Sequence, residues 1–266
     1  MYKNIVFDFG GVMVDFDPHK YLIDLFGNRG LEEEVYDLTF GSREWRLLDA
    51  GRITRREANE RMLQRARAVG RGFEVEGVLD DWMSMLRPRR RMQTLVEQLK
   101  QRGYCVYYLS NIPEDVLDLL MHRDFEGLFD GGVASCEVKI NKPDPRIYQA
   151  LLDKYHLRAD ECIFIDDRAE NLVAASALGF GIYEMHNVGT LLRSLPPFGV
   201  RLPSSRRFHT HSTPPMKTAS NSKRPLPGKA VGQRSFCCAE LTSSRSSGSS
   251  AGCPPAEKSR CSAPSP

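Results

Sequence analysis

The sequence lacks several features that mark large classes of proteins. None of its apolar runs approaches the eighteen or so residues that a membrane span requires. The first residues do not combine a basic region with a long apolar stretch, as a secretory leader does. The seven cysteines include no pair that is backed by a second pair or by histidines at the spacing of a zinc site. We therefore expect no membrane partner and no zinc centre, and a reducing cytoplasm fits best.

Three of the cysteines lie before residue 200. Cys105 and Cys162 fall in apolar, strand-like runs, and Cys136 follows another such run. A free cysteine in such a place usually acts as a small hydrophobic residue. We expect all three side chains to be buried.

Residues 200–266 have few acidic and aromatic side chains. They contain two acidic and two aromatic residues against 15 Ser, nine Pro and 11 Lys or Arg. Because such a segment cannot bury enough apolar surface to offset the entropy lost on ordering, we predict a disordered, low-complexity basic tail. Its basic residues are scattered without aromatic neighbours, so we expect no nucleic-acid partner. An alternative is that the segment is not an evolved sequence, because it has neither helical nor strand periodicity.

The first 199 residues are mildly acidic, with 26 Lys or Arg against 32 Asp or Glu. Short apolar runs predict buried strands at residues 4–7, 104–109, 131–135, 161–165 and 181–185. After the first strand, helical patterns precede or separate each of the others, including one expected over residues 87–102. This alternation predicts an α/β fold, with a parallel sheet covered by helices on both faces.

Residues 18–86 are predicted to be almost wholly helical. Pro18 suits the first turn of a helix, and Thr54 with Glu57 three residues later is typical of a helix start. The segment is too long for a plain crossover between two strands, so we expect it to form its own subdomain. The predicted division is a core of residues 1–17 and 87–199, a helical subdomain of residues 18–86, and the tail of residues 200–266.

Polar residues occur at or just beyond the carboxyl ends of the predicted strands, where open α/β sheets bind ligands. In chain order they are Asp8, Ser110 with Asn111, Lys142, and Asp166 with Asp167. Each alone could belong to an ordinary turn, whereas all four in this order form a strong signal. Gly10 and Gly11 after Asp8 allow a tight turn whose N–H groups point at an anion.

With these motifs in order, residues 3 to about 187 resemble the haloacid dehalogenase (HAD) superfamily. The resemblance is to phosphatase-like members with a helical C1 cap (subfamily IA), similar to bacterial sugar-1-phosphate phosphatases that begin with an Asp-x-Gly-Gly-Val or Asp-x-Gly-Asn-Val turn. It implies a Rossmann-like core with residues 18–86 as the cap. It also implies Mg²⁺-dependent hydrolysis of a small phosphorylated metabolite, with a sugar phosphate as one candidate, through an aspartyl-phosphate intermediate.

The resemblance also implies roles for single residues. Phosphate monoesters repel an incoming anion, so a carboxylate nucleophile needs a divalent cation and a basic group nearby. By resemblance, Asp8 is the nucleophile, Ser110 and Lys142 stabilise the transferring group, and the backbones of Gly11 and Asn111 bind it. Mg²⁺ would be held by Asp8, the carbonyl of Gly10, Asp166 and Asp167, of which Asp167 is the better candidate for direct ligation. Asn171 would hydrogen-bond to these ligands.

Position 10 departs from the family pattern. Most phosphatases of this superfamily have a second aspartate two residues after the nucleophile, which protonates the leaving group and later activates water. Here that residue is Gly10, so another group such as Asp15, Asp17 or water acts instead, or the leaving group needs little protonation. Dehalogenases also lack this acid, so a 2-haloacid dehalogenase is an alternative, although the pair Asp166-Asp167 favours phosphoryl transfer. A catalytically idle binding protein is a third interpretation.

Substrate choice is expected to depend on the cap, because it would close over the site. Candidates for facing the site are His19, Lys20, Arg43 and Trp45. Trp45 has helical spacing with Leu48, which is also typical of a core position. The sequence does not identify the natural substrate or the oligomeric state.

Overall fold

The structure is a computed structural model that describes residues 2–200. All of these residues belong to one compact unit. The prediction of a disordered tail concerns residues that, apart from Val200, lie outside the described part of the chain. Among the helices of residues 2–200, none has both the length and the apolar character needed to cross a bilayer.

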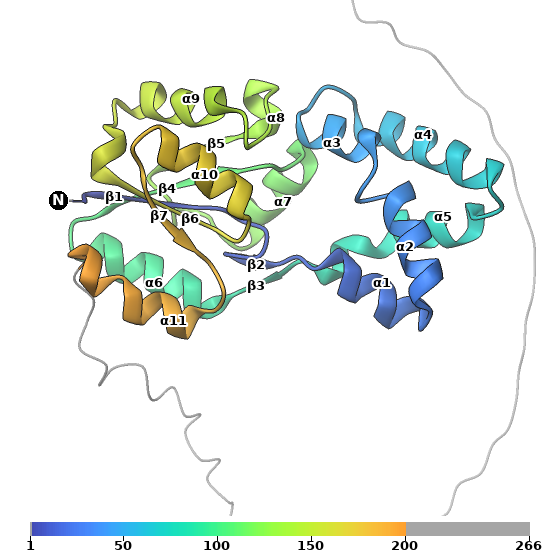
Figure 1. The fold of residues 1–266 in the computed structure, drawn as a ribbon, viewed down its shortest axis with the longest axis horizontal. Coiled ribbons are helices and arrows are strands. Elements are labelled where there is room, and N and C mark those ends of the chain that lie inside the picture. The colour runs from blue at the N-terminus through green and yellow to red at the C-terminus, as the bar shows by residue number, and fades with distance from the viewer. Residues whose placement is uncertain (1, 201–266) are drawn as a thin grey trace, which may run out of the picture. The chain divides into compact units, whose positions relative to one another are not determined.

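A five-stranded parallel sheet forms the centre of the structure, with the strand order β5-β4-β1-β6-β7 (Figure 1). The strands are β1 (Asn4–Phe7), β4 (Cys105–Ser110), β5 (Gly131–Ala134), β6 (Cys162–Asp166) and β7 (Gly181–Glu184). The predicted Rossmann-like α/β fold is confirmed. Because β1 lies between β4 and β6, the polar residues that follow these three strands meet at one edge of the sheet.

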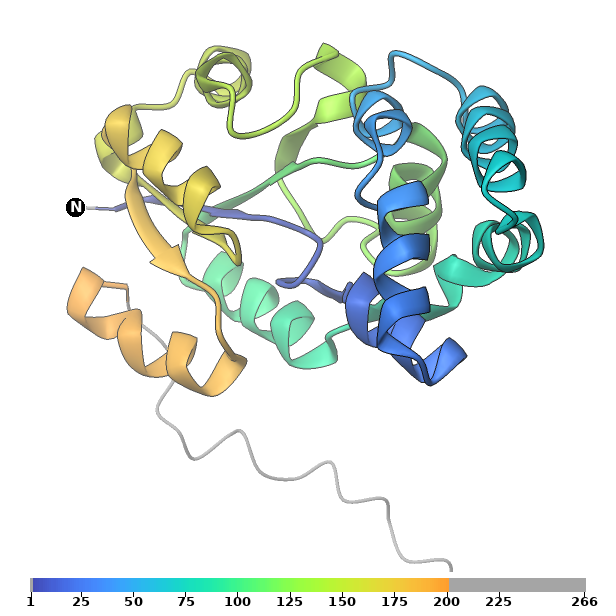
Figure 2. The ribbon, with the colours of Figure 1, turned by 45° about the vertical axis from the view of Figure 1, so that its right-hand side comes forward.

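Helices cover both faces of the sheet, as predicted (Figures 1 and 2). Alternation along β1 sends Ile5 and Phe7 into one apolar cluster and Val6 into another. The first cluster is closed by α6 (Arg90–Gln101), α7 (Glu114–Arg123) and α11 (Val188–Ser194), and the second by α9 (Pro145–Tyr155) and α10 (Ala169–Ala177). The short helix α8 (Ser135–Val138) follows β5. The apolar periodicity of the sequence thus fixes which side of the sheet each helix covers.

The segment between β1 and β4 contains the predicted group of helices. They are α1 (Pro18–Phe26), α2 (Arg29–Leu38), α3 (Arg43–Asp49), α4 (Arg55–Ala68) and α5 (Gly72–Asp81), followed by a 3-10 turn at Trp82–Met85. Helix α4 begins with the predicted capping box of Thr54 and Glu57. The interior residues of these helices join the apolar cluster beneath α6 and α7 without a break. Their division from the core as a separate cap subdomain stays a prediction.

Two very short strands, β2 (Val14–Asp15) and β3 (Arg87–Pro88), pair antiparallel where the chain enters and leaves this helical segment (Figure 1). The helix expected from residue 87 therefore begins only at Arg90, since Arg87 and Pro88 are taken up by this pairing.

Burial of the cysteines is confirmed for Cys136 and Cys162. It is wrong for Cys105, which begins β4 and is exposed, while the following Val106 points into the core.

Candidate active site

Asp8 lies directly after β1, and neighbouring groups fix one of its carboxylate oxygens. The Asp8 N–H donates to the carbonyl of Ile165 at 3.0 Å, and the Phe9 N–H donates to Asp8 Oδ1 at 2.8 Å. Lys142 Nζ lies 2.9 Å from the same oxygen. Within residues 2–200, Asp8 Oδ2 accepts no hydrogen bond. One oxygen of this buried carboxylate is therefore oriented, and the other is available to react.

Lys142 is a buried residue of the site, not a surface lysine. Its ammonium group lies 2.7 Å from Asp166 Oδ2 and donates to the carbonyl of Leu109 at 2.9 Å, in addition to its contact with Asp8. Burial by itself would lower the pKa of Lys142, but Asp8 and Asp166 outweigh it and raise that pKa. Lys142 is therefore protonated and neutralises charge beside Asp8.

Ser110 and Asn111 lie where the sequence predicted, at the end of β4. Ser110 is buried. The Asn111 side chain donates to the carbonyl of Lys142 at 3.0 Å and accepts from the Lys142 N–H at 2.7 Å. Asn111 thus fixes the backbone that carries Lys142, a function of its side chain that the sequence did not reveal. The predicted role of its backbone N–H stays a prediction.

Asp166 and Asp167 differ sharply in their surroundings. Asp166 is fully buried, and its oxygens accept from Lys142, from the Arg168 N–H at 2.8 Å and from Asn171 Nδ2 at 3.0 and 3.1 Å. Asp167 is exposed at the same edge of the sheet. Because the oxygens of Asp166 are already engaged, this arrangement favours Asp167 for direct metal ligation. Asn171 thus contacts Asp166, and its predicted role beside a bound metal stays a prediction.

The three carboxylates of Asp8, Asp166 and Asp167 each bring one oxygen to within 4.8 Å of the others. Burial raises the pKa of Asp8 to about 7, with Asp166 and Asp167 adding to the shift and Lys142 opposing it. Burial and the neighbouring Asp166 also raise the pKa of Asp167. When all three are ionised, Lys142 offsets one of their negative charges. The cluster of hard oxygen donors therefore fits a divalent cation such as Mg²⁺.

The two glycines after Asp8 are constrained differently. Gly11 has φ +68°, and a Cβ there would lie 2.1 Å from Asp167 Oδ2, so a side chain at position 11 would collide with Asp167. Gly10 carries no such constraint, because a Cβ there would lie 3.5 Å from the ring of Phe16, an ordinary contact. The backbone therefore leaves room for a side chain at position 10. Metal ligation by the Gly10 carbonyl stays a prediction.

Arg89 is a residue of the site that the sequence analysis missed. Its guanidinium donates to the carbonyl oxygen of Gly11 and, through Nε, to Asp15 Oδ1 at 2.7 Å, while its N–H donates to the carbonyl of Met13 at 2.8 Å. It thereby ties the loop after Asp8 to the start of α6. No local signal sets Arg89 apart from the basic residues around it in the sequence.

Two cavities flank these residues. A cavity of about 830 Å³ is lined by Gly11 and Asp167 and, from the helical segment and its connections, by polar side chains that include Asp15, Asp17, Lys20 and Arg89. A smaller cavity of about 60 Å³ is lined by Gly10, Ser110 and Asn111 and by the aromatic residues Phe9, Phe16, Trp45 and Trp82. Phe16 lines both cavities. The site therefore has a polar side and a narrow aromatic side.

The four residues proposed to face the site from the helical segment have different positions. Lys20 lines the larger cavity, and Trp45 is buried in the wall of the smaller one. His19 instead pairs with Glu32 at 2.6 Å and stacks on Tyr36. Arg43 is exposed at the start of α3. Only two of the four, Lys20 and Trp45, line either of these two cavities.

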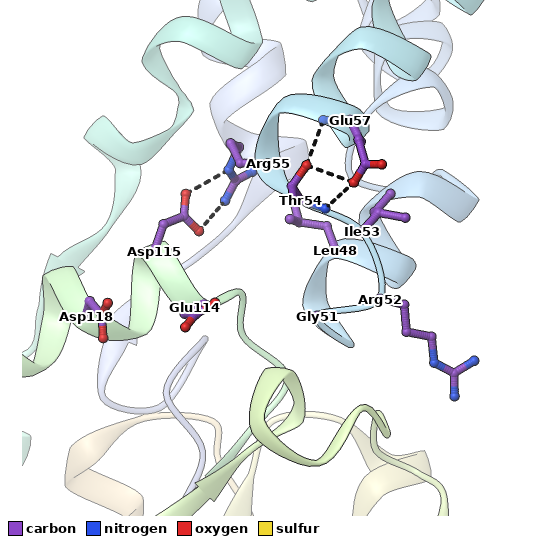
Figure 3. A pocket seen from close by; sticks show the side chains of 10 residues that line it. All are labelled: Leu48, Gly51, Arg52, Ile53, Thr54, Arg55, Glu57, Glu114, Asp115 and Asp118. Carbon is purple, nitrogen blue, oxygen red and sulfur yellow. Dashed lines mark hydrogen bonds and ion pairs between the residues drawn. The ribbon is translucent and has the colours of Figure 1, made fainter. Parts of the chain in front are cut away.

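A third cavity, of about 410 Å³, lies between the start of α4 and helix α7 (Figure 3). Arg55 bonds to both carboxylate oxygens of Asp115, at 2.9 and 3.1 Å, as the dashed lines in Figure 3 show. Its guanidinium also lies 5.6 and 5.2 Å from the ring centres of Trp45 and Trp82. Arg55 therefore joins the start of α4 to α7 and to the aromatic wall of the smaller cavity.

Comparison with known proteins identifies the family. Residues 2–179 match the haloacid dehalogenase-like hydrolases. The chain belongs to this family. Its HAD membership was predicted from the ordered motifs and is confirmed, as is its assignment as a phosphatase-type hydrolase.

The relatives of this chain include two phosphatases. A sesquiterpene phosphatase of Aspergillus oryzae is 31% identical over 196 residues, covering 72% of this chain and 94% of that protein. A D-ribitol-5-phosphate phosphatase of Bacteroides thetaiotaomicron is 29% identical over 201 residues, covering 70% and 93%. An (S)-2-haloacid dehalogenase of Burkholderia cepacia is 32% identical over 95 residues, covering 35% and 41%.

Solved structures show the same fold. A HAD-like hydrolase of Porphyromonas gingivalis is 26% identical with a TM-score of 0.57, covering 73% of this chain and 98% of that one. A HAD enzyme of Bacteroides thetaiotaomicron, solved with magnesium and inorganic phosphate, is 23% identical with a TM-score of 0.55, covering 73% and 100%.

Proposed function

We propose that this HAD hydrolase is a Mg²⁺-dependent phosphatase that acts on a small phosphorylated metabolite and forms an aspartyl-phosphate on Asp8. The observation that carries the proposal is the meeting of three carboxylates and the buried Lys142 at one edge of the sheet. A nucleophile, a fixed cation and a site for a divalent cation are the requirements for displacement at a phosphate monoester.

In the proposed reaction, Asp8 Oδ2 attacks phosphorus while Oδ1 stays bonded to Lys142 and to the Phe9 N–H. Lys142 and the Ser110 hydroxyl stabilise the charge on the transferring group, together with the backbones of Gly11 and Asn111. Mg²⁺, held by Asp8, Asp167 and the Gly10 carbonyl, with Asp166 beside them, would neutralise the charge of nucleophile and phosphate. Water then breaks the bond between phosphorus and Asp8, which releases phosphate and restores the carboxylate.

Asp166 is given a positioning role in this proposal. Its contacts with Lys142, the Arg168 N–H and Asn171 fix the ammonium group beside Asp8. The backbone carbonyl of Asn171 accepts from the buried Tyr148 hydroxyl at 2.9 Å, which fixes Asn171 in turn. The orientation of Lys142 thus rests on a continuous set of hydrogen bonds.

We propose that helices α1–α5 act as the cap and that the substrate enters through the larger cavity. The polar walls of that cavity favour a polar metabolite such as a sugar phosphate. The relative that is a D-ribitol-5-phosphate phosphatase supports this class, and the sesquiterpene phosphatase supports an apolar alternative. Turnover of a panel of sugar phosphates against prenyl phosphates separates the two. Cytoplasmic location stays a prediction from the sequence.

The dehalogenase alternative rests on the absence of an acid at Gly10 and on the similarity to a haloacid dehalogenase. The carboxylate cluster favours the phosphatase, because displacement of halide by a carboxylate requires no divalent cation. Measuring halide release from a 2-haloacid, with Mg²⁺ and with a chelator, tests the alternative directly. Turnover of neither substrate class would favour a binding protein.

The decisive test replaces Asp8 by Asn and measures hydrolysis of p-nitrophenyl phosphate with Mg²⁺ and with EDTA. We expect Mg²⁺-dependent turnover in the wild type and a loss of about 10³-fold or more in Asp8→Asn, because the amide is a poor nucleophile. The variant should fold, since burial already disfavours a charge at this position. Asp160→Asn is the matched control, because this carboxylate is exposed and pairs with Arg158.

The intermediate has its own test. Acid quenching after mixing with a ³²P-labelled substrate should leave label on the wild-type protein and none on Asp8→Asn. Activity of Asp8→Asn near the wild-type level, or metal-independent turnover, would contradict the mechanism.

A further inference from the structure

Asp49, the last residue of α3, lines the smaller cavity together with Gly10 and Ser110. Its side chain is partly buried, and within residues 2–200 its carboxylate oxygens accept no hydrogen bond. No hydrogen bond from the fold thus occupies this carboxylate, which is only partly withdrawn from solvent. The cavity it faces leads to the residues expected to bind phosphate.

The backbone around Asp49 is fastened to the segment that leads to Lys142. The Ser135 hydroxyl donates to the carbonyl of Asp49 at 2.5 Å, the Arg52 guanidinium donates twice to the carbonyl of Lys139 at 3.0 and 3.1 Å, and Asn141 Nδ2 donates to the carbonyl of Arg46 at 2.8 Å. Gly51 has φ +57°, and a Cβ there would lie 2.7 Å from the carbonyl of Cys136. These contacts fix the backbone at Asp49, whereas no hydrogen bond within residues 2–200 fixes its side chain.

We propose that Asp49 is the catalytic acid and base that serves in place of a carboxylate at position 10. This inference rests on the proposed phosphatase function. It follows from the cavity, because Asp49 and Gly10 line the same small space, one from α3 and the other from the loop after Asp8.

The proton balance of the reaction needs one group that first gives and then takes a proton. As Asp8 Oδ2 bonds to phosphorus and the ester P–O bond breaks, the Asp49 carboxyl gives its proton to the departing oxygen, which leaves as an alcohol. The Asp49 carboxylate then takes a proton from water while that water bonds to phosphorus. The P–O bond to Asp8 breaks, phosphate leaves, and both carboxyl groups return to their starting states.

The electrostatic surroundings of Asp49 suit this cycle. Burial raises the pKa of Asp49 to about 7; Asp8 and Asp115 add to the shift, and Arg55 and Arg168 oppose it. A group whose pKa lies near neutral pH can both hold and release a proton during turnover.

The other two candidates, Asp15 and Asp17, are already engaged. Asp15 Oδ1 accepts from Arg89 at 2.7 Å, and the Asp15 side chain is 55% exposed. Asp17 Oδ1 accepts from the Lys20 N–H at 3.0 Å as the cap of α1. Both line the larger cavity, through which the substrate is proposed to enter, whereas Asp49 shares the smaller cavity with Gly10 and Ser110.

The test compares release of two leaving groups in the first turnover, before water attacks the intermediate. The substrates are 2,4-dinitrophenyl phosphate, whose leaving group needs no proton, and glycerol phosphate, whose alkoxide does. In Asp49→Asn we expect the rate constant for glycerol release to fall about 10²–10⁴-fold, the usual contribution of general acid catalysis, and that for dinitrophenolate to fall less than tenfold. The ratio of the two does not depend on how much of the variant is folded.

Asp118→Asn is the matched control, because Asp118 is an exposed carboxylate on α7 that does not line the smaller cavity. It should leave the ratio of the two rate constants unchanged. Equal losses on both esters in Asp49→Asn, or no loss on either, would overturn the role of Asp49 while leaving the phosphatase function intact. A wild-type protein that releases neither leaving group would overturn the proposed function and this inference with it.

Discussion

Gly10 and Gly11 are adjacent in the chain, yet replacement by alanine should weaken Mg²⁺ binding only at position 11. In Gly11→Ala the new Cβ must displace Asp167, and the residue must also keep a left-handed φ. We expect the affinity for Mg²⁺ to fall about tenfold or more, as is usual when the support of a metal ligand is lost. Calorimetric titration of the purified variant with Mg²⁺ measures this.

Gly10→Ala is the internal control for that experiment, because the nearest neighbours of its Cβ are atoms of the Phe16 side chain at ordinary contact distances. It should bind Mg²⁺ as the wild type does and melt at a similar temperature. Equal affinity in Gly11→Ala and the wild type would show that Asp167 does not ligate the metal, or that the loop moves aside without penalty.

At the scale of single residues, the sequence predicted the site residues that directly follow strands. It missed those that come from the helical segment and its connection to α6. Asp8, Ser110 and Asp166 could be predicted because a strand pattern and a parallel sheet together place their carboxyl ends at one edge. Asp49 and Arg89 could not, since each owes its position to contacts between segments far apart in the chain. The residues next to Asp49 and Arg89 in the sequence do not predict such contacts.

At the scale of elements, long periodic segments were predicted well and short ones were not. The helix at Arg90–Gln101 has a strong apolar stripe, and only its first turn was misplaced. The two-residue strands β2 and β3 escaped notice because their pairing joins positions on either side of the helical segment. Such strands carry too few residues for a pattern of their own.

Helix α4 offers a prediction about an element. Thr54→Ala removes the oxygen that accepts from the Glu57 N–H at 3.2 Å, and it also removes the hydroxyl that donates to Glu57 Oε2 at 2.8 Å (Figure 3). We expect the free energy of unfolding to fall by about 1 kcal/mol, the usual effect of losing an N-cap. Urea titration followed by circular dichroism measures the change.

Thr54→Ser keeps the capping oxygen and should differ from the wild type by only a few tenths of a kcal/mol. If Thr54→Ala were as stable as Thr54→Ser, the start of α4 would be held by the pairing of Arg55 with Asp115 rather than by its cap.

At the scale of the whole described chain, the helical segment is joined to the sheet on two sides of the site. The pairing of β2 with β3 forms one connection, beside the larger cavity. Arg52 and Arg55 form the other, through Lys139 and Asp115. With both in place, Gly10 and Ser110 line the smaller cavity, while the larger one is lined by Asp167 and Gly11. If the helical segment opens away from the sheet, one of these connections must break. Arg52 and Arg55 can separate from Lys139 and Asp115 while β2 and β3 stay paired.

The chain length needed for folding gives the last prediction. Val200 is 1% exposed and its N–H donates to the carbonyl of Leu195 at 3.1 Å, so the apolar core extends one residue beyond the predicted boundary at 199. A protein ending at Val200 should keep its melting temperature and its turnover of p-nitrophenyl phosphate, because residues 201–266 have a composition unsuited to a core. For a protein ending at Phe198, the free energy of unfolding should fall by about 2 kcal/mol, which is the value of burying a valine. Its melting temperature should fall by about 4–8 °C. Loss of stability or turnover already at Val200 would mean that the remaining segment contributes to the fold.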